Sequence, residues 1–254
     1  MGCGVFVIGP AGSGKTTLCQ VLREYYVAAK RRVVLVNLDP AQMHEDFDFD
    51  IDIRDHLSLM DVMEEADFGP NGGLLAGVEA VADNLDILEL PEEEDAFMLF
   101  DCPGQIELYI HSESIKRIVE NVQKCHTVMM VYALDATHVL EMGKFVAGAI
   151  SATIAMAKFE VPHMNVFTKC DLVGEEEIEE FLYGLDKETI HERMGYESEQ
   201  ENRFNMALAT IISDNGLLGF YPIDYKNEQA IEDLTYQIDA CTQYLESQEP
   251  QTKE

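Results

Sequence analysis

The sequence predicts an α/β fold in which a mostly parallel sheet is flanked by helices, with helical inserts between some of the strands. Short apolar runs alternate with longer amphipathic segments, which is typical of parallel strands joined by crossover helices. The runs are continuously apolar, as expected for strands that are covered on both faces. The 254 residues, of which 47% are hydrophobic, suffice for one large domain with a packed core.

The individual elements follow in chain order. Residues 4–9 form the first expected strand, and a glycine-rich turn leads into a helix-periodic stretch at 16–30. Further strands are expected at 33–38, 97–100, 128–134, 165–168 and Phe220-Tyr-Pro-Ile223. Acidic inserts at 40–96 and 174–215 are too short to be separate domains, and their acidic runs are expected to be solvated. One domain is therefore expected over residues 1–246, followed by a polar tail at 247–254.

The charge balance argues against nucleic acid and membranes as direct partners. With 17 Lys and Arg against 48 Asp and Glu, the net charge is −31, so binding to phosphate backbones or anionic membranes is unfavourable. The six cysteines lie far apart, which is typical of reduced thiols. Neither an apolar run of about 18 residues nor a basic leader is found, so a cytoplasmic protein is expected.

The turn after the first strand matches the phosphate-loop pattern. It reads Gly9-Pro-Ala-Gly-Ser-Gly14-Lys15-Thr16 and lies where the pattern requires, between a buried strand and a helix. Its backbone N–H groups and the helix N-terminus would hold phosphate oxygens. Lys15 would reach the β and γ phosphates, and the Thr16 hydroxyl would bind Mg²⁺. The pattern therefore predicts a P-loop NTPase.

Candidate catalytic and metal-binding side chains follow two later strands. Asp101 ends the strand at 97–100 and is the expected carboxylate partner of Thr16 at Mg²⁺. Three and four residues on, the Gly104 amide could sense the γ-phosphate and Gln105 could contact the attacking water. Asp39 ends the second strand. There it could bind Mg²⁺ through a water molecule, orient the attacking water, or only form an Asx turn before a proline.

The identity of the base is indicated by Thr168-Lys-Cys-Asp171, which follows another buried run. The Asp171 carboxylate can accept from guanine N1–H and the 2-amino group together, whereas adenine has no matching donors. Lys169 would lay its methylene stem along the base. GTP and GDP are therefore the expected ligands. The residues expected to hold them are Gly12, Ser13, Gly14, Lys15, Thr16, Thr17, Thr168, Lys169, Cys170 and Asp171.

A further segment completes a set of motifs that resembles a known family. Gly69-Pro70-Asn71 stands in the first insert and precedes Gly72-Gly73-Leu74. With Asp39-Pro-Ala, Asp101-Cys-Pro-Gly-Gln-Ile-Glu107 and Thr168-Lys-Cys-Asp171 in the same order, the chain resembles the GPN-loop GTPases over residues 4 to about 246. Asp52-Ile-Arg54 and Ile106-Glu-Leu-Tyr109 are most similar to the type 3 branch of the eukaryotic family, with type 2 next.

The resemblance implies properties that the residues alone do not. It implies a dimer, either a homodimer or a heterodimer with a paralogue, in which Asn71 of one subunit reaches the other subunit's site and steadies the phosphate. It implies a role in the assembly and nuclear import of RNA polymerase II, with polymerase subunits or assembly factors as partners. A cytoplasmic protein that can shuttle to the nucleus would fit this role. One departure is Gln42, which stands where the family has a second Ala after Asp-Pro-Ala.

Other interpretations stay open at this point. A slow or non-hydrolysing GTP-bound scaffold or chaperone could use its acidic surface to shield a basic protein client. Dimeric ATPases of the partitioning or metal-delivery type carry a lysine where this chain has Pro10, and a P-loop kinase would need an arginine-rich lid. No arginine finger is evident. Arg54 is a further candidate near the Asp39 segment, but a partly exposed arginine more often forms a surface pair. The apolar face of 142–159 fits core packing better than a client groove.

Overall fold

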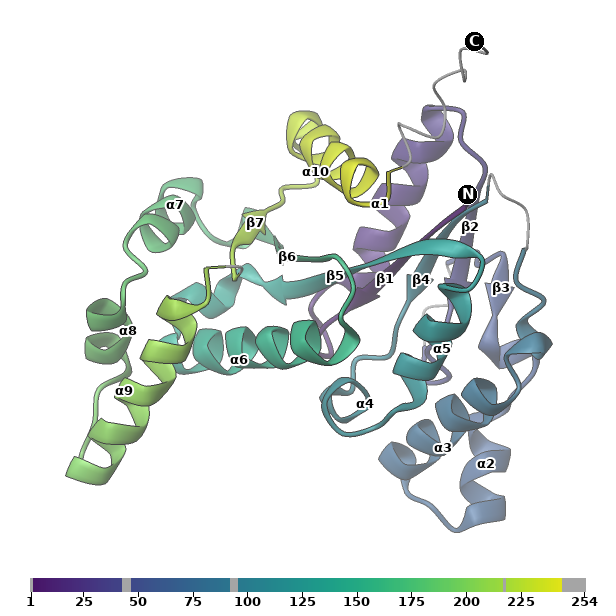
Figure 1. Cartoon of the computed structure of the whole chain (residues 1–254), viewed down its shortest axis with the longest axis horizontal. Coiled ribbons are helices and arrows are strands. Elements are labelled where there is room, and N and C mark those ends of the chain that lie inside the picture. The colour runs from purple at the N-terminus through teal and green to yellow at the C-terminus, as the bar shows by residue number, and fades with distance from the viewer. Residues whose placement is uncertain (1, 43–46, 92–95, 217, 244–254) are drawn as a thin grey trace.

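The computed structural model describes residues 2–42, 47–91, 96–216 and 218–243. Within them, all paired strands are parallel and form one sheet in the order β3-β2-β4-β1-β5-β6-β7 (Figure 1). The strands are β1 Gly2–Ile8, β2 Val33–Asn37, β3 Ile51–Asp52, β4 Phe97–Asp101, β5 His126–Asp135, β6 His163–Thr168 and β7 Phe220–Pro222. The predicted α/β architecture is confirmed, and β3 is an additional edge strand within the first insert.

Helices cover both faces of the sheet. The α-helices are α1 Lys15–Ala28, α2 Leu59–Ala66, α3 Pro70–Asp83, α4 Ile106–Ile110, α5 Ser114–Val122, α6 Met142–Phe159, α7 Glu175–Tyr183, α8 Lys187–Met194, α9 Glu199–Asp214 and α10 Glu228–Cys241. Short 3₁₀ helices are η1 Ile53–Asp55, η2 Leu85–Leu88, η3 Ala136–Leu140 and η4 Cys170–Leu172. Helices α1 and α10 lie on one face, and α3, α5 and α6 lie on the other (Figure 1).

The central strand shows why the apolar runs are continuous. Every residue of β1 is buried, because β4 and β5 pair with its two edges and helices cover both faces. Phe6 and Ile8 pack into the core beneath α3, α5 and α6, whereas Val5 and Val7 pack beneath α1 and α10. A strand with two buried faces has no polar side, so the alternation seen in half-exposed strands is absent.

The strand order brings distant parts of the chain to one edge of the sheet. Strand β4 lies between β1 and β2, and Asp101 pairs in register with Val7 on one side and Asn37 on the other. The carboxyl ends of these three strands, and the loops that follow them, therefore meet. This edge holds the phosphate loop, Asp39 and the segment after Asp101.

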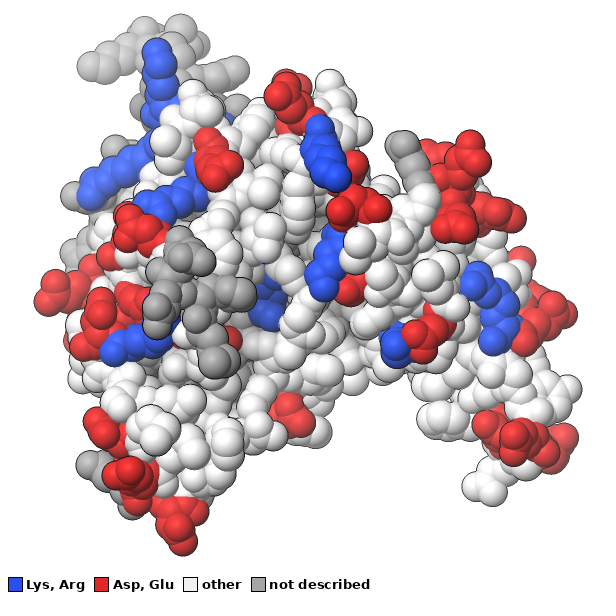
Figure 2. Space-filling view, turned by 180° about the vertical axis from the view of Figure 1, so that it is seen from behind, with Lys and Arg blue, Asp and Glu red and all other residues white. Residues whose placement is uncertain are grey.

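The two inserts form projections beside the sheet. In the first insert α2 packs against α3, and in the second α8 packs against α9 (Figure 1). Glu176 and Glu177 in the first turn of α7 are exposed, as expected for a solvated helix. Figure 2 shows acidic side chains on both projections. Residues 247–254, the predicted tail, lie outside the described part of the chain.

In the acidic run of the first insert, Asp48 and Asp50 are exposed, as expected, and two of its carboxylates also make contacts with β2. Asp50 accepts a 2.7 Å hydrogen bond from the Leu35 backbone N–H and pairs with Arg23 at 3.0 Å. Asp52 accepts a 2.9 Å bond from Asn37. These carboxylates attach β3 and the residue before it to β2, because the edge of β2 has backbone and side-chain donors that a neighbouring carboxylate can accept. The rest of the run, at 43–46, lies outside the described residues.

Helix α6 confirms that the apolar stretch at 142–159 packs in the core. Met142, Phe145, Val146 and Ala149 are buried against the sheet, while Ile154 is 37% exposed on the opposite side of the helix. Among the described residues, no helix combines the length and apolar character that crossing a membrane requires.

Candidate functional site

The phosphate loop adopts a conformation that depends on its glycines. Gly9, Gly12 and Gly14 all have positive φ angles, of 140°, 76° and 80°. A Cβ atom on Gly9 would lie only 2.2 Å from the Ala133 carbonyl oxygen, so no other residue fits there. Gly14 is the N-cap of α1, and Ser13 beside it has a buried hydroxyl with no partner among the described residues. The loop thus leads from β1 directly to the positive end of a helix, as the motif requires.

Lys15 is buried in the phosphate loop. Its side chain is 7% exposed, and its Nζ donates a 3.0 Å hydrogen bond to the Pro10 carbonyl. Burial lowers the pKa of the ammonium, while the nearby carboxylates of Asp101 and Asp39 oppose this shift. The loop curls around the side chain that begins its helix, so the charge lies inside the turn.

Thr16 and Asp101 meet as predicted, although 85 residues separate them. The Thr16 hydroxyl donates a 2.6 Å hydrogen bond to Asp101 Oδ2. Asp101 is 1% exposed, and burial raises its pKa to about 6. Its other oxygen, Oδ1, is buried and has no partner among the described residues. An unsatisfied carboxylate oxygen beside a hydroxyl is costly in an apolar setting unless a cation or a donor binds there.

This pair fits the ligand chemistry of Mg²⁺. Mg²⁺ prefers oxygen ligands and is commonly held by one or two carboxylates together with phosphates, rather than by an all-protein cage. The described residues contain no group of three His, Cys, Asp or Glu side chains that could hold a metal ion. Thr16 and Asp101 therefore match a site that a bound nucleotide would complete.

Asp39 forms the Asx turn and also faces the site. Its Oδ1 accepts a 2.9 Å hydrogen bond from the Ala41 N–H, and its own N–H donates to Asn37 Oδ1 at 2.9 Å. Burial raises the pKa of Asp39, and Lys15 opposes that shift through its charge. One oxygen is thus used by the turn, whereas the carboxylate charge still acts on Lys15 and Asp101.

Gln105 and Asn71 are in contact within one chain. Gly104 packs so closely on the phosphate loop that a Cβ would lie 2.7 Å from Ala11 Cα. Next to it, Gln105 Nε2 donates a 2.8 Å hydrogen bond to Asn71 Oδ1 at the start of α3. Gln105 Oε1 is buried and has no partner among the described residues. The family resemblance implies that Asn71 contacts the partner's phosphate, and that role stays a prediction. The contact of Asn71 with Gln105 was not expected from the sequence.

The Thr-Lys segment binds the phosphate loop. Thr168 is buried, and its hydroxyl donates to the Ser13 carbonyl at 2.6 Å. Lys169 Nζ donates to the Gly12 carbonyl at 2.6 Å and pairs with Asp135 at 2.8 Å. Thr168 was expected among the nucleotide ligands. Its side chain supports the loop, because β6 ends next to the loop, and its role as a ligand stays a prediction. Asp135, at the end of β5, is a supporting residue that no motif indicated.

The Cys-Asp part of the segment has two different environments. The Cys170 thiol donates to the Phe167 carbonyl at 3.3 Å, and burial raises its pKa to about 11, so the side chain is directed at its own strand. Asp171 is exposed and lines a cavity of about 390 Å³ with Cys170, with Tyr221 of β7 and with Asp224 beyond it. The Asp171 carboxylate is thus open to a ligand in this cavity, and its contact with a base stays a prediction.

Tyr225 is a site residue that sequence reasoning missed. Its hydroxyl is buried without a partner among the described residues and lies 3.8 Å from the position of a Cβ on Gly14. Burial raises the pKa of Tyr225 well above its usual range. A single aromatic residue beyond a short last strand forms no pattern, so only its tertiary position identifies it.

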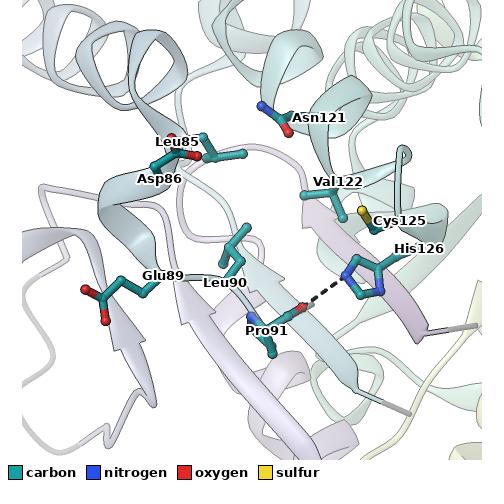
Figure 3. A pocket seen from close by; sticks show the side chains of 9 residues that line it. All are labelled: Leu85, Asp86, Glu89, Leu90, Pro91, Asn121, Val122, Cys125 and His126. Atoms are coloured by element: carbon teal, nitrogen blue, oxygen red, sulfur yellow. Dashed lines mark hydrogen bonds between the residues drawn. The ribbon is translucent and has the colours of Figure 1, made fainter. Parts of the chain in front are cut away.

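A second cavity lies at the opposite edge of the sheet and does not belong to this site. It is about 310 Å³ in volume and is lined by residues of η2, the end of α5 and the start of β5 (Figure 3). His126 Nε2 donates a 3.1 Å hydrogen bond to the Pro91 carbonyl oxygen. Because His126 is the first residue of β5, this cavity is at the amino ends of the strands, away from the phosphate loop.

Fold and site together define the class. A parallel sheet whose first strand leads into a phosphate loop, with the loop threonine bound to a carboxylate from a neighbouring strand, is a P-loop nucleotide-binding protein. A family model described as "Conserved hypothetical ATP binding protein" matches residues 7–244. A relative from Saccharomyces cerevisiae named "GPN-loop GTPase 3" is 39% identical over 97% of this chain and 94% of its own length. The chain belongs to the GPN-loop GTPase family.

Further comparisons agree with this assignment. Relatives of the same name from Yarrowia lipolytica and Dictyostelium discoideum are 39% and 38% identical, covering 97% and 96% of this chain and 94% and 88% of their own lengths. They confirm the resemblance to the type 3 branch. A solved GTPase from Pyrococcus abyssi in its apo form superposes with a TM-score of 0.74 at 23% identity, over 94% of this chain and 97% of that one. This likeness confirms the fold.

Proposed function

We propose that this protein is a magnesium-dependent GTPase that works as a dimer. The observation that carries the proposal is the Thr16–Asp101 pair directly beside a phosphate loop, with its 2.6 Å bond and an Asp101 Oδ1 that has no partner in the described part of the chain. Thr16 and Asp101 would hold Mg²⁺, which supplies positive charge to the β and γ phosphates. The loop N–H groups and Lys15 hold the same phosphates from the other side.

Two side chains orient the attacking water. Gln105 Oε1 is buried without a partner among the described residues, so it is an available acceptor for a water hydrogen. Asp39 contributes Oδ2, the carboxylate oxygen that does not take part in its Asx turn, as a second acceptor for the water. Asn71 supports hydrolysis either from the partner subunit, as the family resemblance implies, or through its bond to Gln105. Water attacks the γ-phosphorus, the bond to the β-phosphate oxygen breaks, and GDP and phosphate are released.

Guanine recognition is assigned to Asp171, and its amide variant tests this. We expect the wild-type protein to bind GTP well over tenfold more tightly than ATP, because only guanine offers two donors to one carboxylate. Asp171→Asn should weaken GTP binding and improve XTP binding, since xanthine has a carbonyl where guanine has the amino group. Competition against a fluorescent GDP analogue measures all three affinities. Asp233→Asn, another exposed carboxylate at the same cavity, is the matched control.

The same preparation also tests hydrolysis. The description of the matching family model mentions ATP, so the comparison of the two nucleotides is decisive. Equal affinity for ATP and GTP in the wild-type protein would refute the role of Asp171. If GTP binds tightly with Mg²⁺ but single-turnover hydrolysis is not faster than in buffer, the protein is the non-hydrolysing scaffold rather than a GTPase.

The cellular role is proposed from the family resemblance. We propose that the protein acts in the assembly and nuclear import of RNA polymerase II, in the cytoplasm and with shuttling to the nucleus. A net charge of −31 suits contact with basic client surfaces and not with nucleic acid. Depletion in its own cells should make polymerase II subunits accumulate in the cytoplasm, as fluorescence microscopy would measure. Wild-type protein should restore import and Lys15→Ala should not; normal import after depletion would refute the role.

A further inference from the structure

The side chain of Gln42 lies against the two residues assigned to Mg²⁺. Its Nε2 donates to Thr16 Oγ1 at 3.0 Å and to Asp101 Oδ2 at 3.3 Å. A carboxamide nitrogen has two hydrogens, so one group can serve both acceptors. The three side chains form a closed triangle, because Thr16 itself donates to Asp101 Oδ2.

The backbone carbonyl of Gln42 is held by Arg54. Arg54 Nη1 donates to the Gln42 carbonyl at 2.9 Å. The same guanidinium donates through Nε and Nη2 to Asp52, at 3.0 and 2.6 Å, and these bonds raise the pKa of Arg54. Asp52 is in turn tied to Asn37 at the end of β2. Arg54 therefore does more than form a surface ion pair with Asp52. It anchors the backbone of Gln42, whose side-chain amide lies in the site.

The amide and a metal ion need the same electron pairs. Thr16 Oγ1 and Asp101 Oδ2 have lone pairs that can face either an N–H group or a cation. The hydrogens of a carboxamide carry partial positive charge, so they would be repelled by a divalent cation at the same oxygens. The Gln42 amide must then rotate away for Mg²⁺ to bind.

We propose that Gln42 is a built-in competitor for Mg²⁺, whose amide binds the Thr16–Asp101 pair and lowers the affinity of the nucleotide-bound site for the ion. This inference rests on the proposed magnesium-dependent GTPase function. Displacing the amide couples Mg²⁺ binding to the conformation of the segment that starts at Asp39, which also takes part in the site. The expected weakening is roughly tenfold, the ratio that corresponds to one or two hydrogen bonds of ordinary net strength.

The test measures how tightly Mg²⁺ binds the complex with GDP. Release of a fluorescent GDP analogue is followed while free Mg²⁺ is varied, using the full-length protein. Gln42→Ala removes the whole side chain, and Gln42→Met keeps its length without the amide. Both should lower the Mg²⁺ midpoint roughly tenfold while leaving GDP affinity in excess chelator unchanged. Gln123→Ala, an exposed glutamine after α5, is the matched control and should leave the midpoint unchanged.

A spectroscopic readout follows the amide itself. In protein labelled with ¹⁵N, the side-chain NH₂ signal that disappears in Gln42→Ala should shift when Mg²⁺ is added to the GDP complex. Arg54→Lys cannot bind Asp52 and the Gln42 carbonyl through one planar fork, so it should lower the midpoint in the same direction but less. Correct folding of each variant is checked by thermal unfolding.

The outcomes separate the inference from the proposed function. An unchanged or raised Mg²⁺ midpoint in both folded Gln42 variants overturns the competitor role and leaves the GTPase proposal standing. GDP binding by the wild-type protein that does not depend on Mg²⁺ contradicts the magnesium site itself and the inference with it. A lowered midpoint in Gln42→Ala but not in Gln42→Met would mean that space, rather than the amide, limits the ion, and this also overturns the inference.

Discussion

Lys15→Ala should lower GTP affinity by roughly a hundredfold or more, because it removes the cation that meets the phosphates inside a buried loop. Lys15 is 7% exposed, so water cannot replace the lost ammonium as it could at the surface. Isothermal titration with GTP and Mg²⁺ measures the loss. Lys124→Ala, an exposed lysine in the turn after α5, is the control and should bind GTP like the wild-type protein.

The fold should survive this substitution, although the side chain is buried. The bond to the Pro10 carbonyl is the one hydrogen bond found for Nζ among the described residues, and burial already lowers the pKa of the ammonium, which shows a desolvation cost. Removing the side chain ends that cost but also takes the cation away from Asp101 and Asp39, so we expect the nucleotide-free protein to keep a cooperative thermal unfolding transition. GTP hydrolysis at the wild-type rate in a folded Lys15→Ala protein would disprove the phosphate-loop assignment.

Asn71→Ala should slow single-turnover GTP hydrolysis by about a hundredfold to a thousandfold, the usual effect of losing one positioned donor at a developing charge. GTP binding and dimerisation should be kept, because the side chain is exposed and the first turn of α3 does not need it. Rapid-quench measurement with enzyme in excess gives the rate. Asn121→Ala, an exposed asparagine on α5, controls for the loss of a surface amide.

The structure allows two routes for this effect, and Asn71→Asp separates them. If Asn71 donates Nδ2 to the partner's phosphate, the Asp variant loses that donor, adds a negative charge and should be as slow as Asn71→Ala. If Asn71 acts by accepting from Gln105 at 2.8 Å, the Asp variant keeps the acceptor and should retain much of the rate. A wild-type rate in Asn71→Ala excludes both routes.

Mixed dimers give an independent answer. In a dimer of Asn71→Ala with Lys15→Ala, only the first subunit binds GTP, and the only intact Asn71 is in the other. Action in trans should therefore restore hydrolysis, whereas positioning of Gln105 within one chain should not. If activity does not return although subunit exchange is proven, for example by energy transfer between labelled subunits, the trans role of Asn71 is wrong.

The sequence alone determined the features that depend on neighbouring residues. The glycines of 9–14 allow the positive φ angles that the phosphate loop needs, and the buried run before them specifies β1. The continuous apolar runs predicted a parallel sheet, and each predicted strand lies within a few residues of an observed one. Boundaries moved because pairing extends a strand beyond its apolar part, as with Gly2 in β1.

Only the tertiary structure decided which side chains meet at the carboxyl edge of the sheet. Asp101 reaches Thr16 because β4 inserts between β1 and β2, and the periodicity of the chain does not contain this strand order. The placement of Gln42 against Asp101 likewise depends on a contact with a residue far away in sequence. A local pattern sets which residue types are available and the backbone they can adopt, whereas the packing of distant elements sets where each side chain points and how strongly water is excluded around it.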